Sequence, residues 1–150
     1  MTHAPRPAGF LMHDSWRPDL VLARKRELAG GPRAAGVARR WVAGLLSARI
    51  GRADMHDVAL LVSEVVTNAV RHGGAGAGDT IVVHVAIGGE LLRVEVCDHG
   101  PGFVAPAAPR RRADGGGHGL MLVEHLSSSW GVSGDDGTCV WFERALAPRG

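Results

Sequence analysis

Two stretches of the chain place apolar residues at the spacing of an amphipathic helix. The first covers Ala34–Leu46, where apolar positions recur every four residues from Val37 to Leu45. The second runs from Asp54, a candidate N-cap, to about His72. Its apolar stripe is wide enough to be buried between other elements and consists of Val58, Leu61, Val62, Val65, Val66, Ala69 and Val70.

Strand patterns, in which apolar residues alternate or run together between glycine-rich turns, follow the helices. They cover Thr80–Ile87, Leu91–Cys97, Trp130–Ser133 and Thr138–Leu146. The turn Gly88-Gly89 predicts a hairpin for the first pair. A further helix is expected over Gly119–Ser129, and Leu20–Leu28 fits either a strand or a short helix.

The order of these elements predicts an α+β fold, because helices come first and then strands, one helix and further strands. We expect a two-layer sandwich in one domain over residues 19–150, after a flexible tail over residues 1–18. The stretch Phe103–Gly117 is rich in proline, arginine and glycine and has no period, as in a functional lid or a disordered loop.

The composition is that of a globular domain, with 45% hydrophobic and 21% charged residues among 150. The net charge of +2 does not indicate a nucleic-acid or membrane partner, although Arg24–Arg26 and Arg110–Arg112 are local basic clusters. Without an apolar run near the roughly 20 residues of a bilayer span, or a secretory signal pattern, we expect a cytoplasmic protein. Cys97 and Cys139 lie in apolar runs and are interpreted as small buried residues, not as a disulfide or a zinc site.

Polar residues interrupt the second helix at a regular spacing. Glu64, Asn68 and His72 are four residues apart and therefore share one helix face. A carboxylate and an amide beside the apolar stripe are costly to bury unless they are satisfied. A ligand site and a solvated helix face are both compatible with this pattern.

Two glycine clusters flank the aperiodic stretch. Asp98 continues the inward parity of its strand, and as a buried carboxylate it needs a donor such as the amino group of adenine. Gly100 and Gly102 would let a flat base approach the backbone, although an ordinary Asp-x-Gly turn is the alternative. The run Gly115–Leu120 opens a helix, as in an anion site or a flexible hinge.

In order, these residues resemble the sequence boxes of the GHKL ATPases, the superfamily of gyrase, heat-shock chaperone, histidine kinase and mismatch-repair ATPases. The matching segments are Ser63–Gly73 (asparagine box), Asp98-x-Gly100-x-Gly102 (first glycine box), Gly117-His118-Gly119-Leu120 (second glycine box) and Gly137-Thr138. Ser-Glu-x-x-x-Asn-Ala followed by His-Gly is similar to bacterial anti-sigma factors that are also serine protein kinases. The resemblance covers about Gly31–Glu143 and implies a Bergerat fold, with a mixed, mostly antiparallel sheet covered on one face by helices.

The resemblance implies a role for each matching residue. Asn68 would hold Mg²⁺, Glu64 would be the general base, and Asp98 would bind the adenine amino group of ATP. Arg39, on the first helix, would contact a partner. The other implied ATP-binding positions are His72, Gly100, Gly102, Gly117, His118, Gly119, Leu120 and Thr138.

The implied function is that of an ATP-dependent serine/threonine-protein kinase and anti-sigma factor. It would phosphorylate a STAS-type anti-sigma-factor antagonist and sequester a sigma factor, and relatives in this branch often form homodimers. A non-catalytic ATP-binding switch is the main alternative, and Glu64 favours the kinase because binding ATP alone does not need a carboxylate there. A third alternative is the catalytic half of a sensor histidine kinase; since the sequence shows no long dimerisation helix with an acceptor histidine, it would have to belong to a split system. A DNA-binding domain is not favoured, because there is no helix-turn-helix or zinc pattern.

Overall fold

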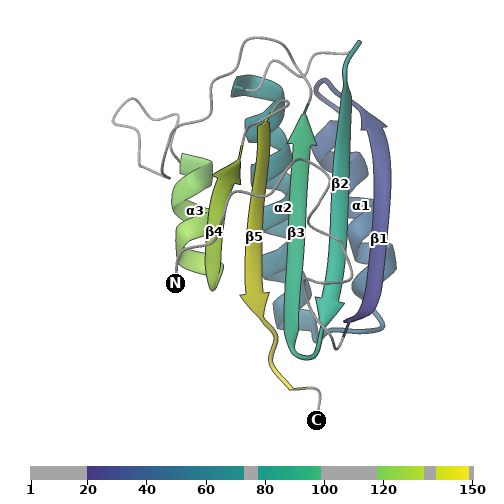
Figure 1. Ribbon diagram of the computed structural model, residues 1–150, viewed down its shortest axis with the longest axis vertical. Helices are drawn as coiled ribbons and strands as arrows, with labels where there is room; N and C mark the ends of the chain where they lie inside the picture. Colours follow the sequence, from purple (N-terminus) through teal and green to yellow (C-terminus); the bar gives the residue numbers. More distant parts are fainter. Residues whose placement is uncertain (1–19, 73–77, 99–117, 134–137, 149–150) are drawn as a thin grey trace.

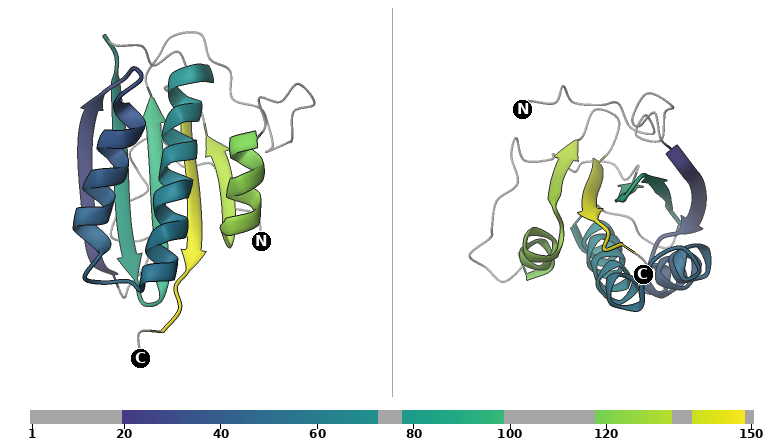
Figure 2. Two further views of the ribbon diagram at one scale, coloured as in Figure 1. Left: turned by 180° about the vertical axis from the view of Figure 1, so that it is seen from behind. Right: turned by 90° about the horizontal axis from the view of Figure 1, so that it is seen from below.

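The computed structural model describes residues 20–72, 78–98, 118–133 and 138–148, which form one sheet and three helices (Figure 1). In chain order the elements are β1 (Leu20–Ala29), α1 (Ala34–Leu46), α2 (Arg52–His72), β2 (Thr80–Gly88), β3 (Leu91–Asp98), α3 (His118–Leu126), β4 (Ser129–Ser133) and β5 (Thr138–Ala145). All three helices lie on one face of the sheet, as Figure 2 shows from behind and from below. The predicted two-layer α+β sandwich is therefore confirmed.

The sheet has the strand order β1-β2-β3-β5-β4, and every pairing among the described strands is antiparallel. The predicted β2–β3 hairpin is present, and Gly89 in its turn has φ 60°, a conformation that favours glycine. The ambiguous segment at 20–28 is a strand, because it pairs with β2 along its length. Only Leu22 and Leu28 of β1 are buried, as befits a strand at the sheet edge.

The core lies between the helices and the sheet. The apolar stripe of α2 supplies its centre, with Val58, Leu61 and Val62 fully buried. Inward-facing side chains of the sheet, such as Val94 and Phe142, form the other half of the core and are also fully buried. Burying each such side chain stabilises the fold by about 1.5–3 kcal/mol before the entropy cost is counted. No helix in the described ranges is long and apolar enough to cross a bilayer.

The start of α2 differs from the prediction. The helix begins at Arg52, so Asp54 lies in its first turn and the interpretation of Asp54 as the N-cap is wrong. Its carboxylate instead accepts hydrogen bonds from Arg144 Nη2 at 3.0 Å and from the backbone N–H of Ala147 at 2.9 Å. A carboxylate at this end of a helix is also favoured by the helix dipole.

The sheet face away from the helices carries polar side chains that are nevertheless buried. His84, Arg93 and Glu95 are 5%, 6% and 1% exposed. Arg93 pairs with Glu143 on β5, and its guanidinium lies 4.1 Å from the centre of the Trp141 ring. Charged residues at alternate positions of a strand, such as Arg93 and Glu95, do not reveal from the sequence that their face is buried.

The cysteines share this face and are linked. Cys97 and Cys139 occupy directly opposite positions on β3 and β5, with their Cα atoms 4.0 Å apart, and form a disulfide. Both are buried, as predicted, but the interpretation that they form no disulfide is wrong. The sequence does not predict the disulfide, because strands β3 and β5 are not consecutive and their pairing leaves no local pattern.

Candidate functional site

Glu64 and Asn68 lie on the side of α2 that faces α3. Asp57, two turns before Glu64, shares this side of the helix. The Asp57 carboxylate accepts a hydrogen bond of 2.8 Å from Arg144 Nη2, and Nη1 of the same arginine donates to the carbonyl of Leu126 at the end of α3. The line from Asp57 through Glu64 to Asn68 therefore borders the neighbouring helix α3, and Figure 2 shows α2 between α1 and α3.

Both residues are half-buried, at the margin of the core. Leu61 and Val65, beside them on the same helix, are completely or almost completely buried. A side chain in this position has packed neighbours and remains partly accessible to solvent. The exposure of Glu64 and Asn68 is therefore lower than that of a fully solvated helix face, and it is compatible with a ligand site.

Asp98 ends β3 and is only 2% exposed. Leu92, Val94 and Val96 share its parity and belong to the core, so Asp98 lies on the helix side of the sheet, as predicted. Thr138 lies directly opposite Asp98 on the adjacent strand β5. The register thus brings together two positions, 98 and 138, that the family resemblance assigns to the adenine end of the site.

The second glycine box lies at the start of a helix, as predicted. Helix α3 begins at His118, so Gly119 and Leu120 belong to its first turn. His72 is the last residue of α2. Gly100, Gly102 and Gly117 lie outside the described residues, as does the expected lid Phe103–Gly117 with its arginine cluster.

Arg39 projects from α1 onto α2. It is exposed, and its Nη1 donates a hydrogen bond of 3.1 Å to Oγ of Ser63, the residue before Glu64.

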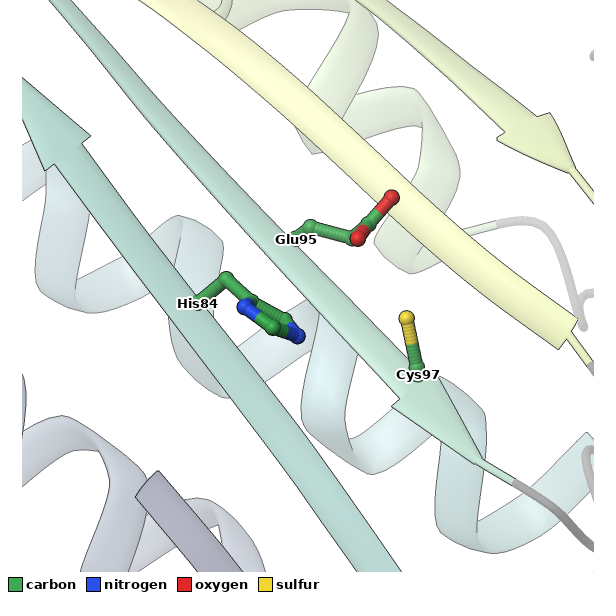
Figure 3. Close-up of side chains that lie close together, drawn as sticks. All are labelled: His84, Glu95 and Cys97. Carbon is green, nitrogen blue, oxygen red and sulfur yellow. The ribbon is translucent and has the colours of Figure 1, made fainter. Parts of the chain in front are cut away.

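A second cluster was not singled out by the sequence analysis. His84, Glu95 and Cys97 meet on the opposite sheet face, as Figure 3 shows. Burial lowers the pKa of His84, and the charge of Lys25 on β1 lowers it further. The sequence does contain a signal for part of this cluster. A hairpin whose two-residue turn follows Gly88 pairs His84 with Glu95.

Comparison with known proteins places the chain in a family. Residues 28–144 match the model of the histidine kinase-like ATPase domain, which covers most of the chain. The chain therefore belongs to the histidine kinase-like ATPase domain family, and the resemblance drawn from its sequence boxes is confirmed.

Two curated proteins are similar to most of the chain. The chain is 32% identical over 130 residues to the serine-protein kinase RsbW of Bacillus licheniformis, an alignment that covers 77% of this chain and 80% of the relative. It is 28% identical over 130 residues to the serine-protein kinase RsbW of Oceanobacillus iheyensis, with 77% of this chain and 82% of the relative covered.

Proposed function

We propose that this protein is an ATP-dependent serine/threonine-protein kinase of the anti-sigma type. Its substrate would be a serine of a STAS-type anti-sigma-factor antagonist, and a sigma factor would be its second partner. The observation that carries the proposal is the half-buried pair Glu64 and Asn68 beside α3, on the helix that covers the sheet face to which the buried Asp98 belongs. The similarity to two serine-protein kinases supports it.

The donor atoms of these residues fit a magnesium nucleotide. Mg²⁺ prefers oxygen ligands and keeps several waters, so the single amide oxygen of Asn68 is a sufficient protein ligand. The carboxylate of Asp98, buried at the end of β3, is an acceptor suited to the adenine amino group. When bound, the metal nucleotide supplies the phosphoryl group and neutralises charge that develops on its oxygens.

Glu64 would accept the proton of the partner's serine hydroxyl. The serine oxygen then bonds to the γ-phosphorus while the bond from that phosphorus to the bridging oxygen of ADP breaks. Since phosphoryl transfer depends mainly on positioning and electrostatics, a base on a packed helix is well suited to the task. The exposed Arg39, hydrogen-bonded to Ser63, would help to seat the acidic or polar surface of the partner.

The decisive experiment measures transfer of labelled phosphate from ATP to purified antagonist proteins. Glu64→Gln should lower the transfer rate by about 10²–10⁴-fold, because the amide does not accept the serine proton. ATP affinity should remain close to that of the wild type. Glu90→Gln, at an exposed position in the β2–β3 turn, is the matched control and should transfer at the wild-type rate.

The outcomes separate the proposal from its alternatives. Wild-type rates in Glu64→Gln would show that Glu64 is not the base. Binding of ATP without transfer to any antagonist would favour the non-catalytic switch, in which ATP only changes the affinity for a partner. Transfer to a histidine would indicate the catalytic half of a two-component kinase.

A further inference from the structure

The sheet face away from the helices holds a compact set of metal-ligating side chains. The potential ligand atoms of His84, Glu95 and Cys97 all lie within 4.8 Å of one another. The register explains this arrangement, since His84 on β2 pairs with Glu95 on β3, and Cys97 follows on the same face two residues later. Figure 3 shows the three side chains projecting from the two strands on the side away from the helices.

This cluster is separate from the proposed kinase site. Glu95 and Cys97 have the opposite parity to Asp98 and therefore lie on the other side of the sheet. Glu64 and Asn68 are on α2, which packs against the opposite face of the sheet. The proposed phosphoryl transfer uses neither His84 nor Glu95, so their burial together needs its own explanation.

A fourth donor adjoins the cluster. Cys139 lies opposite Cys97 on β5, and the two are joined by a disulfide. A disulfide sulfur is a poor metal ligand, because metals bind the thiolate. Reduction would therefore convert one crosslink into two thiols next to an imidazole and a carboxylate.

We propose that the reduced protein binds one Zn²⁺ through His84, Glu95, Cys97 and Cys139, and that formation of the disulfide releases it. One nitrogen, one oxygen and two sulfur ligands form a donor set that suits tetrahedral Zn²⁺. The metal would also balance the negative charge of a carboxylate and two thiolates in a buried location.

The redox steps need an external dithiol–disulfide couple: a reduced dithiol protein opens the Cys97–Cys139 bond, and an oxidised, disulfide-bearing protein takes the two electrons back when the bond forms again and Zn²⁺ is released. One thiolate of the reductant attacks the Cys97–Cys139 bond, the second resolves the mixed disulfide, and two electrons pass to the cysteines. The reductant leaves as a disulfide, and its two protons are delivered to the two cysteines. Binding of Zn²⁺ then releases those protons to solvent as the thiolates coordinate.

The test compares the full chain in its oxidised and phosphine-reduced forms, each freed of metal by a chelator that is then removed. Zn²⁺ affinity is measured by competition with a chromophoric chelator, and Co²⁺ replaces Zn²⁺ as a spectroscopic probe. The reduced protein should bind one equivalent with a thiolate-to-cobalt charge-transfer band. The oxidised protein should show no such band and a Zn²⁺ affinity at least about tenfold weaker.

Variants assign the ligands. His84→Gln should weaken Zn²⁺ binding by the reduced protein at least about tenfold, because even the loss of an outer-shell partner costs that much. His56→Gln, at an exposed position on α2, is the matched control and should bind as the wild type does. Cys97→Ser should lose much of the charge-transfer band. If His84→Gln does not fold, Cys97→Ser still tests whether the cluster binds the metal.

Four results would each overturn the proposal. One is a reduced wild-type protein without the charge-transfer band. Another is equal Zn²⁺ affinity in the oxidised and reduced forms. The third is a full band in Cys97→Ser, and the fourth is an equal loss of affinity in His56→Gln and His84→Gln.

Discussion

The indole of Trp141 occupies space that any side chain at Gly131 would need. Gly131 on β4 lies opposite Trp141 on β5, and a Cβ atom added there would come within 2.7 Å of Cζ2 of the ring. The ring cannot shift cheaply, because its face also supports the guanidinium of Arg93. A glycine in a strand, ordinarily a weak choice, is required here by close packing.

Gly131→Ala should therefore destabilise the protein by about 1–3 kcal/mol through overpacking. Gly44→Ala is the matched control, since nothing lies within 4 Å of its added Cβ on helix α1. That control should raise stability by about 0.5–1 kcal/mol, because alanine is the better helix former. Urea unfolding measures both, and equal stability of the two variants would contradict the packing argument.

Asn68 allows the metal role to be tested apart from catalysis. If its amide oxygen holds Mg²⁺, Asn68→Ala should weaken ATP binding at least about tenfold in the presence of Mg²⁺, and far less in its absence. Calorimetry with and without a chelator measures the difference. His56→Ala, an exposed change on the same helix, is the control. An Mg²⁺-dependent affinity unchanged in Asn68→Ala would remove this residue from the metal site.

At the scale of the elements, Arg144 connects three of them. From β5 it donates to Asp54 and Asp57 in the first turns of α2 and to the carbonyl of Leu126 at the end of α3. The arginine and Asp54 are largely buried, with side chains 17% and 7% exposed. This linkage ties α3 to α2, the helix that carries Glu64 and Asn68.

Arg144→Met should lower the free energy of unfolding by about 2–3 kcal/mol, since it leaves the Asp54 carboxylate without its ion pair. Arg40→Met, at an exposed position on α1, should change stability by less than about 0.5 kcal/mol. Denaturant unfolding compares the two. A similar small effect from both substitutions would mean that the Arg144 contacts do not hold the helices together.

The elements also show what the sequence could predict. Local periodicity predicts α1 with its observed bounds, the glycine turn predicts the β2–β3 hairpin, and strand parity predicts the inward direction of Asp98. The pairing of β3 with β5 joins segments 42 residues apart at the cysteines, and no local pattern encodes it. For that reason the disulfide, the Arg93–Glu143 pair and the Arg144 contacts were missed.

At the scale of the whole molecule, the sheet separates two chemically different faces. The helix side carries the proposed nucleotide residues, and the other side carries the buried cluster of His84, Glu95 and the two cysteines. The faces meet in the backbone, because Cys97 precedes Asp98 and Cys139 follows Thr138. The disulfide therefore crosslinks the two strand ends that carry the predicted adenine-binding positions.

Removal of this crosslink should destabilise the whole fold. A disulfide with a sequence separation of 42 residues restricts the unfolded chain by about 4 kcal/mol in the loop-entropy account. With a chelator present to exclude metal, the phosphine-reduced protein should unfold at a correspondingly lower urea concentration. The double variant Cys97→Ala/Cys139→Ala should match the reduced protein and no longer respond to phosphine. If oxidised and reduced protein unfolded together, the crosslink would contribute nothing to stability, and the strand ends around Asp98 would be held by sheet hydrogen bonds and core packing alone.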